Sequence, residues 1–159
     1  NQLYLSSREL RYNWFEKIRT EYNASAIAVA HHSDDSIETI LLNLLRGTGL
    51  KGICGIRPKN GYVVRPLLCV NRKETEEHLK ENGISYITDS TNLENEYTRN
   101  KIRNIVMPIL REINPQIDSV MLSNAENFTA AESIYRSVIE KEKSLKRMFL
   151  ILRMGKQIL

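Results

Sequence analysis

The sequence predicts an α/β fold, with a largely parallel sheet, flanking helices and a helical C-terminal part. Helical and strand-like patterns alternate along the chain, which is typical of parallel strands joined by crossover helices. The 159 residues suffice for one domain with its own hydrophobic core. Apolar residues make up 42% and charged residues 26% of the chain, and this balance excludes a disordered or fibrous class.

The first two expected elements are a helix and a strand. Residues 7–22 should form an amphipathic helix, because Leu10, Trp14 and Ile18 recur at four-residue steps. The short run at residues 26–30 is apolar and contains β-branched side chains, as in a buried strand of a covered sheet. The sheet is therefore expected to begin at this run.

The next helix is expected over residues 34–46. Ser33 would be its N-cap, and Gly47 would supply the left-handed residue that ends it. Its apolar stripe consists of Ile37, Ile40, Leu41, Leu44 and Leu45. At about 100° per residue, Asp35, Glu38 and Arg46 lie together on one flank of this stripe.

A cluster of polar side chains surrounds the start of this helix, namely His31, His32, Asp34, Asp35 and Glu38. Ligands of open α/β sheets bind at the carboxyl ends of strands, and the cluster begins at such a position. The helix dipole alone favours acidic residues in a first turn, so each aspartate also has a purely structural explanation. The dipole does not account for both histidines or for Glu38, and the cluster as a whole therefore indicates a functional site. Zinc is disfavoured because most of its ligands would be carboxylates, so no metal site is predicted.

The second half of the chain contains a basic helix. After a strand at residues 62–65 and a solvated helix at residues 74–82, the residues Asp89, Ser90, Thr91 and Asn92 should form a polar loop. Thr98 would cap a helix on which Arg99 and Arg103 lie one turn apart, and Asn100 adds a donor. These groups suit a phosphate or an RNA backbone, although a solvated basic face is the alternative.

Pro108 should end or kink that helix, and a long helical pattern at residues 116–146 follows it. The basic tail of this last pattern is expected to be an exposed helical surface rather than an RNA contact. Arg46 could point toward a phosphate or the substrate, or it could simply interact with the dipole at the end of its own helix.

The composition also bears on location and partners. No apolar run is long enough to cross a bilayer, and Cys54 and Cys69 suit a reducing compartment as small core residues. The formal charge of +4 favours a polyanionic partner. We therefore expect a cytoplasmic protein with no membrane partner.

The segment HHSDDSIETILLNLLRGTGLKGICGI, beginning at His31, resembles the central signature of the tRNA(Ile)-lysidine synthases, which belong to the PP-loop ATP pyrophosphatases. VVRPLL at residues 63–68, DSTNLENEYTRNKIRNIVMPIL at residues 89–110 and INP at residues 113–115 follow in the order of that family. The HHxDDxxET part is shared with PP-loop enzymes that thiolate tRNA, whereas the other segments indicate lysidine synthases.

The resemblance implies a partial Rossmann-like PP-loop domain, of the adenine nucleotide alpha hydrolase-like kind, over residues 1–110. A helical extension over residues 111–159 would close the same domain. It also implies a ligase that uses ATP, with Mg²⁺, to adenylate C2 of the wobble cytidine of tRNA(Ile). Free L-lysine then displaces AMP to form lysidine, after pyrophosphate has left in the first step.

The same resemblance assigns roles to the candidate residues. Asp35 and Glu38 would recognise lysine and help its amine to lose a proton, and Asp34 is a weaker candidate. The remaining residues that would contact lysine, ATP or tRNA are His31, His32, Arg46, Arg99, Asn100 and Arg103. Either histidine could equally be a core residue satisfied by the backbone.

The sequence departs from the family pattern in one large respect. The phosphate-binding SGGxDS loop of the family does not occur here, nor do its C-terminal RNA-binding domains. We therefore expect the chain by itself to be inactive, with an uncovered face that favours self-association, for example as a homodimer. A PP-loop tRNA thiolase and a truncated, non-catalytic RNA-binding homologue are the alternatives. Cys54 and Cys69 make a poor pair for a thiolase.

Overall fold

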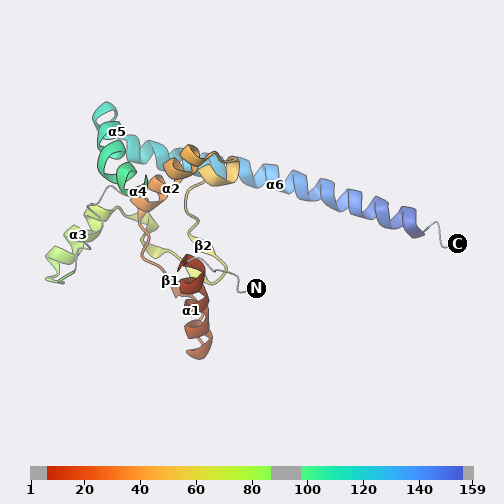
Figure 1. Ribbon diagram of the computed structural model, residues 1–159, viewed down its shortest axis with the longest axis horizontal. Helices are drawn as coiled ribbons and strands as arrows, with labels where there is room; N and C mark the ends of the chain where they lie inside the picture. The colour runs from red at the N-terminus through yellow and green to blue at the C-terminus, as the bar shows by residue number, and fades with distance from the viewer. Residues whose placement is uncertain (1–6, 87–97, 156–159) are drawn as a thin grey trace.

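A computed structural model describes residues 7–86 and 98–155 (Figure 1). The predicted loop at residues 89–92 lies outside these residues. The elements follow one another as α1 (Ser7–Glu21), β1 (Ile27–Ala28), α2 (Ser33–Arg46), the 3₁₀-helix η1 (Leu50–Ile53), β2 (Lys59–Asn60), β3 (Val63–Val64), the 3₁₀-helix η2 (Pro66–Cys69), α3 (Arg72–Glu81), α4 (Thr98–Lys101), the π-helix η4 (Ile102–Val106), α5 (Met107–Ile113) and α6 (Ile117–Gly155).

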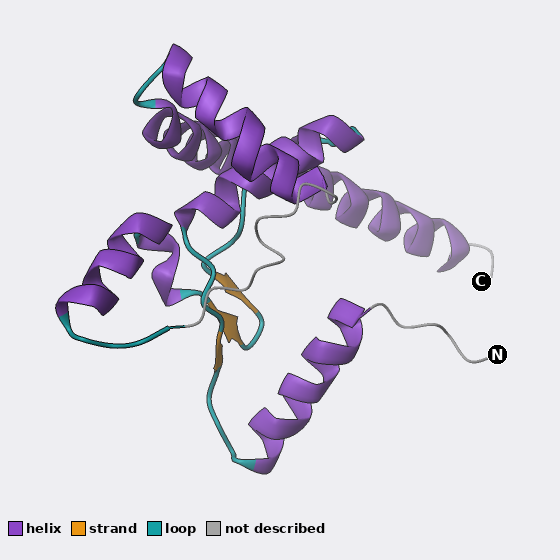
Figure 2. Ribbon diagram, turned by 60° about the vertical axis from the view of Figure 1, so that its left-hand side comes forward, coloured by secondary structure: helices purple, strands orange, loops and turns teal. Residues whose placement is uncertain are grey.

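The sheet is small and mixed. Its strand order is β1-β3-β2, with β1 parallel and β2 antiparallel to β3, and Ile27 is paired with Val63. The α/β class with flanking helices is confirmed, but the antiparallel strand was not expected. Gly61 explains it, because this glycine has a φ of 60° in the two-residue loop between β2 and β3. Figure 2 shows the short strands at the centre, with helices around them.

Helix α2 begins one residue earlier than expected. Its N-cap is His32, in an extended conformation, and Ser33 is the first helical residue and is buried. Gly47 ends the helix with a φ of 76°, as predicted. The apolar stripe is only partly correct, since Leu44 and Leu45 are more than half exposed. Only the first two turns of α2 are therefore packed deeply into the core.

Residues 98–113 form one continuous helical stretch with a π turn in its middle. The backbone N–H of Met107 donates to the carbonyl of Ile102, five residues earlier. In a regular α-helix these two residues would lie roughly 140° apart around the axis. The wider π turn instead allows both to be buried against Ile37 of α2. Pro108 does not end the helical stretch, and it follows the π turn directly as the second residue of α5.

Helix α6 contacts α2, η1 and α5 along its first part and then projects away from the rest of the molecule (Figure 1). Its core-facing residues are Ile117, Met121, Leu122 and Ala125. Cys54 is buried as predicted, whereas Cys69 is exposed, because it follows β3 in the surface helix η2. Within the described ranges, no helix is both long and apolar enough to span a membrane.

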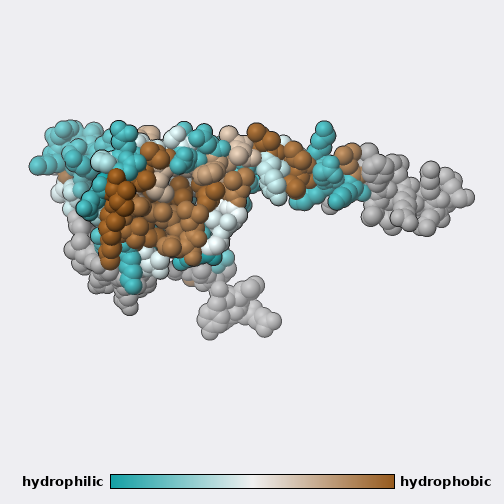
Figure 3. All heavy atoms as spheres, turned by 90° about the horizontal axis from the view of Figure 1, so that it is seen from above, coloured by the Kyte–Doolittle hydropathy of each residue, from teal (hydrophilic) through white to brown (hydrophobic). Residues whose placement is uncertain are grey.

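A broad hydrophobic area lies on the face seen from above (Figure 3). Elsewhere, α1 also exposes apolar side chains, since Leu10 and Trp14 are 56% and 58% exposed. The amphipathic pattern of residues 7–22 therefore gave the helix correctly, yet α1 meets little besides β1. Self-association through such faces stays a prediction.

Candidate functional site

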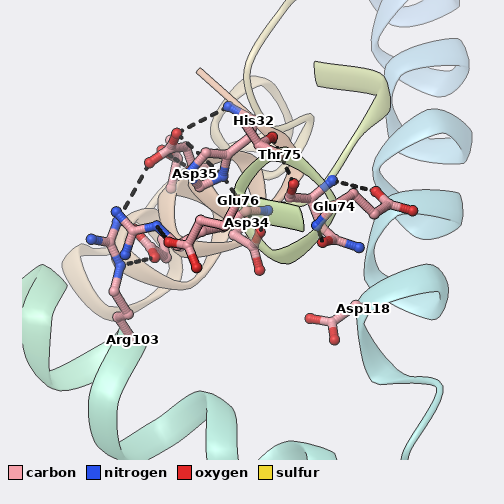
Figure 4. A network of polar contacts seen from close by, with 12 residues as sticks. His32, Asp34, Asp35, Glu74, Thr75, Glu76, Arg103 and Asp118 are labelled. Atoms are coloured by element: carbon pink, nitrogen blue, oxygen red, sulfur yellow. Dashed lines mark hydrogen bonds and ion pairs between the residues drawn. The ribbon is translucent and has the colours of Figure 1, made fainter. Parts of the chain in front are cut away.

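A cleft of about 710 Å³ opens where β1 ends and α2 begins. Its walls come from α2, η2, α3, the helical stretch from η4 to α5, and α6. Its charged lining includes Asp34, Glu38, Arg72, Arg103, Arg111 and Asp118. The position agrees with the rule that ligands bind beyond the carboxyl ends of strands in α/β sheets. Figure 4 shows Arg103 turned toward Asp35, with Asp34 nearby and Asp118 on a separate helix.

Arg103 and Glu38 form the central ion pair of the cleft. The Nε and Nη2 atoms of Arg103 donate to the two carboxylate oxygens of Glu38 at 2.5 and 2.8 Å. Arg103 Nη2 also lies 3.5 Å from Asp35 Oδ1. Glu38 is only 2% exposed, so the guanidinium neutralises a carboxylate that water cannot reach. Together, Glu38 and Asp35 raise the pKa of Arg103, and the residue is fully charged.

Asp35 has a second, structural role. Its Oδ2 accepts a hydrogen bond from the backbone N–H of His32 at 3.0 Å, which is one half of a capping box at the start of α2. Asp35 does not line the cleft, whereas Asp34 and Glu38 do. The structure thus joins the two residues predicted to be catalytic through Arg103 but presents only one of them to the cleft.

Asp34 links α2 to α3 and α5. Its Oδ2 accepts from the backbone N–H of Arg72 at 2.7 Å, and its Oδ1 accepts from Arg111 at 3.1 Å. The nearby His32 imidazole, above all, holds the pKa of Asp34 well below its usual range, and the Arg72 N–H and Arg111 lower it further. Burial opposes this shift without overcoming it. Asp34 is therefore ionised throughout the physiological range.

The two histidines occupy different environments. His32 Nδ1 lies 3.4 Å from Asp34 and 3.5 Å from Asp35. This nitrogen is buried, and it has no hydrogen-bond partner in the part of the chain that the structure describes. His31 Nδ1 accepts a hydrogen bond from Nε of Arg65 at 3.2 Å. Only His32 lines the cleft.

Arg99 lies beside the central pair, although its side chain is 41% exposed. Its Nη2 donates to Thr39 Oγ1 at 2.9 Å, and its Nε is 3.8 Å from Glu38. Asn100 sits next to it on α4 and is partly buried. Arg46 is separate from this group, because it is exposed at the last turn of α2 and does not line the cleft.

Several cleft residues were not predicted from the sequence. Arg111 binds Asp118 through two hydrogen bonds of 2.8 and 3.0 Å and so joins α5 to α6. The start of α3, a helix expected to be only a solvated surface, lines the cleft as well. Its capping box could have been predicted from the sequence, since Asn71 and Glu74 have the spacing of such a box and exchange hydrogen bonds between side chain and backbone. No local signal, however, indicates that this helix start faces α2.

The described residues do not form a magnesium site of their own. Across residues 7–86 and 98–155, no three histidine, cysteine or carboxylate side chains are grouped to hold a metal ion. The carboxylates of Asp34, Glu38 and Asp118 are each engaged by an arginine instead. Charge in this cleft is therefore balanced between protein groups, and no chemical step is assigned to a metal here.

The fold and this cleft define a class of protein. Residues 1–110 match the PP-loop domain family, and the chain belongs to that family.

The relatives it matches are more specific. A Bacteroides thetaiotaomicron protein named tRNA(Ile)-lysidine synthase is 53% identical over 140 residues, which make up 88% of this chain and 33% of that protein. Proteins of the same name from Parabacteroides distasonis and Thermosipho africanus are 51% and 41% identical, over 87% and 86% of this chain and 32% of each relative. The chain thus spans about a third of the length of the curated relatives it matches.

Proposed function

We propose that this chain is part of an enzyme that attaches lysine to the wobble cytidine of tRNA(Ile) at the expense of ATP. The observation that supports this most strongly is the Arg103–Glu38 pair, with Asp35 beside it, at the cleft beyond β1. These residues lie in the segments that resemble the lysidine synthases, and two relatives of that name are 53% and 51% identical over most of this chain.

The carboxylates of the cleft could receive a cationic amino acid in exchange for the arginines that they now bind. Asp34, Glu38 and Asp118 line it, and carboxylates attract an ammonium group and can accept a proton from it. In the proposed reaction, ATP adenylates C2 of the cytidine, pyrophosphate leaves, and the ε-amine of lysine then displaces AMP. The amine must lose a proton before it attacks, and Glu38 with Asp35 is the pair assigned to this task.

Glu38 cannot take up lysine while Arg103 holds both of its oxygens. Arg103 is 19% exposed along its side chain and belongs to a π turn, a geometry that is often found at functional sites. We assign it an exchange role: the guanidinium leaves Glu38 for a phosphate of the adenylated tRNA, and the lysine ammonium takes its place. The carboxylate pair would thus be exposed to lysine only after the RNA had been bound.

The test measures AMP formation by a version of the protein that is extended to the full length of its relatives. We expect AMP only when L-lysine, ATP and the isoleucine tRNA are all present. Asp35→Asn and Glu38→Gln should each raise the KM for lysine at least tenfold and change the KM for ATP little. Glu77→Gln, on the exposed side of α3, serves as a matched acidic control.

Two results would sink this proposal. AMP formation that does not depend on lysine would remove the assigned substrate. A well-folded full-length protein that binds tRNA but forms no AMP would instead favour the non-catalytic RNA-binding homologue.

A further inference from the structure

Arg65 is a buried cation at the edge of the sheet and lies outside the cleft lining. It directly follows β3 and is only 7% exposed. Because β1 and β3 are parallel, Arg65 lies at the same edge as His31, which follows β1. Both residues thus lie at the carboxyl ends of neighbouring strands, where α/β sheets bind their ligands.

The hydrogen bonds of Arg65 go to neutral groups. Its Nε donates to His31 Nδ1 at 3.2 Å, and its Nη1 donates to the backbone carbonyl of Arg57 at 2.7 Å. An imidazole nitrogen that accepts a hydrogen bond belongs to an unprotonated site, so neither acceptor brings a negative charge. The guanidinium carries five N–H groups, and these two bonds use only part of them.

Other arginines of the structure show how unusual this is. Arg19, Arg103 and Arg111 are all more exposed than Arg65, yet each forms an ion pair with a carboxylate. Arg65 forms no ion pair within the described parts of the chain. Burying a charge without a counter-charge is costly, because the lost hydration is not replaced by Coulomb attraction.

We propose that Arg65 is an oxyanion subsite, in which its guanidinium binds a phosphate or carboxylate group of a substrate beside His31. The planar fork of an arginine suits two oxygens of one such group. The small exposed fraction suits a single oxyanion rather than a long polyanion. The natural source of that group rests on the proposed function: it is a phosphate of ATP or tRNA, or the α-carboxylate of lysine.

The subsite can be tested by direct binding to the ¹⁵N-labelled chain, without any catalysis. The Arg65 Nε–H resonance would be followed at constant ionic strength during titrations with pyrophosphate, ATP, L-lysine and cadaverine, which is lysine without its carboxylate. We expect a saturable shift with a phosphate compound or with lysine, and none with cadaverine. A response to pyrophosphate and ATP identifies a phosphate site, and a response to lysine alone identifies a carboxylate site.

Variants separate the subsite from general charge effects. The compounds that shift the Arg65 resonance should also raise the melting temperature of the wild-type chain by several degrees, because they bind only the folded state. Arg65→Met should lose this increase. Arg65→Lys keeps the positive charge but lacks the planar guanidinium, and it should bind these compounds at least tenfold more weakly. This variant replaces Arg65→Met if Arg65→Met does not fold. Arg57→Gln is the matched control, since it keeps the carbonyl to which Arg65 donates and should bind as the wild type does.

The proposal is overturned if the Arg65 resonance responds to none of the four compounds, or if Arg57→Gln loses as much binding as Arg65→Lys. These outcomes are independent of AMP formation. A subsite confirmed in a protein that makes no lysidine would leave the binding site standing and remove the proposed reaction.

Discussion

Arg103 donates hydrogen bonds to both carboxylate oxygens of Glu38, a residue 65 positions earlier in the chain. This pair links the π-helix η4 to the second turn of α2. The pair sits against the core formed by Ile37, Ile102 and Met107. A bidentate pair in this position has two consequences. It holds the two walls of the cleft together, and it gives a buried carboxylate two charge-assisted hydrogen bonds in place of water.

The first prediction concerns the stability that this pair provides. Glu38→Gln should lower the free energy of unfolding by about 3 kcal/mol, because it leaves a partly buried guanidinium without its counter-charge. Urea denaturation followed by circular dichroism would measure the loss. Glu140→Gln removes an exposed partner of Lys143 and should cost less than about 0.5 kcal/mol. Equal losses in the two variants would show that the buried pair is energetically no different from a surface pair.

The second prediction concerns acid stability. The pKa of Asp34 is depressed in the folded state, chiefly by His32, so its stabilising contribution is complete above the pKa of the unfolded chain, about 4. That contribution is lost as the pH falls below this value, because the folded protein must then take up a proton that it binds poorly. Asp34→Asn should therefore flatten the fall in unfolding free energy between about pH 5 and pH 2.5.

Urea midpoints across this pH range would measure the effect. Glu77→Gln, from the exposed pair with Lys73, should leave the wild-type acid profile unchanged. If Asp34→Asn retains the full acid dependence, the depressed pKa of Asp34 does not contribute to stability.

Local features of the fold could be predicted from the sequence, and long-range ones could not. The periodicity and Gly47 place α2 within one residue of its observed start, because helix ends depend on nearby residues. The hairpin at residues 59–64 could also have been predicted, since Gly61, the first residue of its two-residue loop, is a common turn signal between two strands. The exposure of Leu44 and Leu45 was not readable, because it depends on which neighbours cover the end of α2.

The site follows the same division. Asp35, Glu38 and Arg103 were each singled out on local grounds, yet their contact depends on the packing of η4 against α2. The π turn that sets the direction of Arg103 has no distinct sequence signal besides the nearby Pro108. Arg65 and Arg111 were missed because their partners, His31 and Asp34, lie 34 and 77 positions away.

The third prediction tests the core behind the site. Ile102 is 1% exposed, and Ile102→Ala should cost about 3 kcal/mol of unfolding free energy, since it leaves a cavity between α2 and η4. Ile105→Ala lies in the same π-helix but is 46% exposed, and it should cost under about 1 kcal/mol. Thermal or urea unfolding of both variants gives the comparison. Similar costs would mean that the π turn does not direct Ile102 into the core.

The last prediction separates the two explanations of Arg46, which stands exposed at the end of α2. If this arginine only complements the helix dipole, Arg46→Gln should lower stability by about 0.3–1 kcal/mol and leave RNA binding unchanged. We expect the opposite result, an unfolding free energy within about 0.5 kcal/mol of wild type and weaker tRNA binding. One lost phosphate contact should reduce the slope of log Kd against log salt by about one, which fluorescence anisotropy with labelled isoleucine tRNA would resolve. Arg11→Gln removes an exposed charge from α1, and its salt slope should match that of the wild type because we expect Arg11 to make no phosphate contact and so to release no counterion.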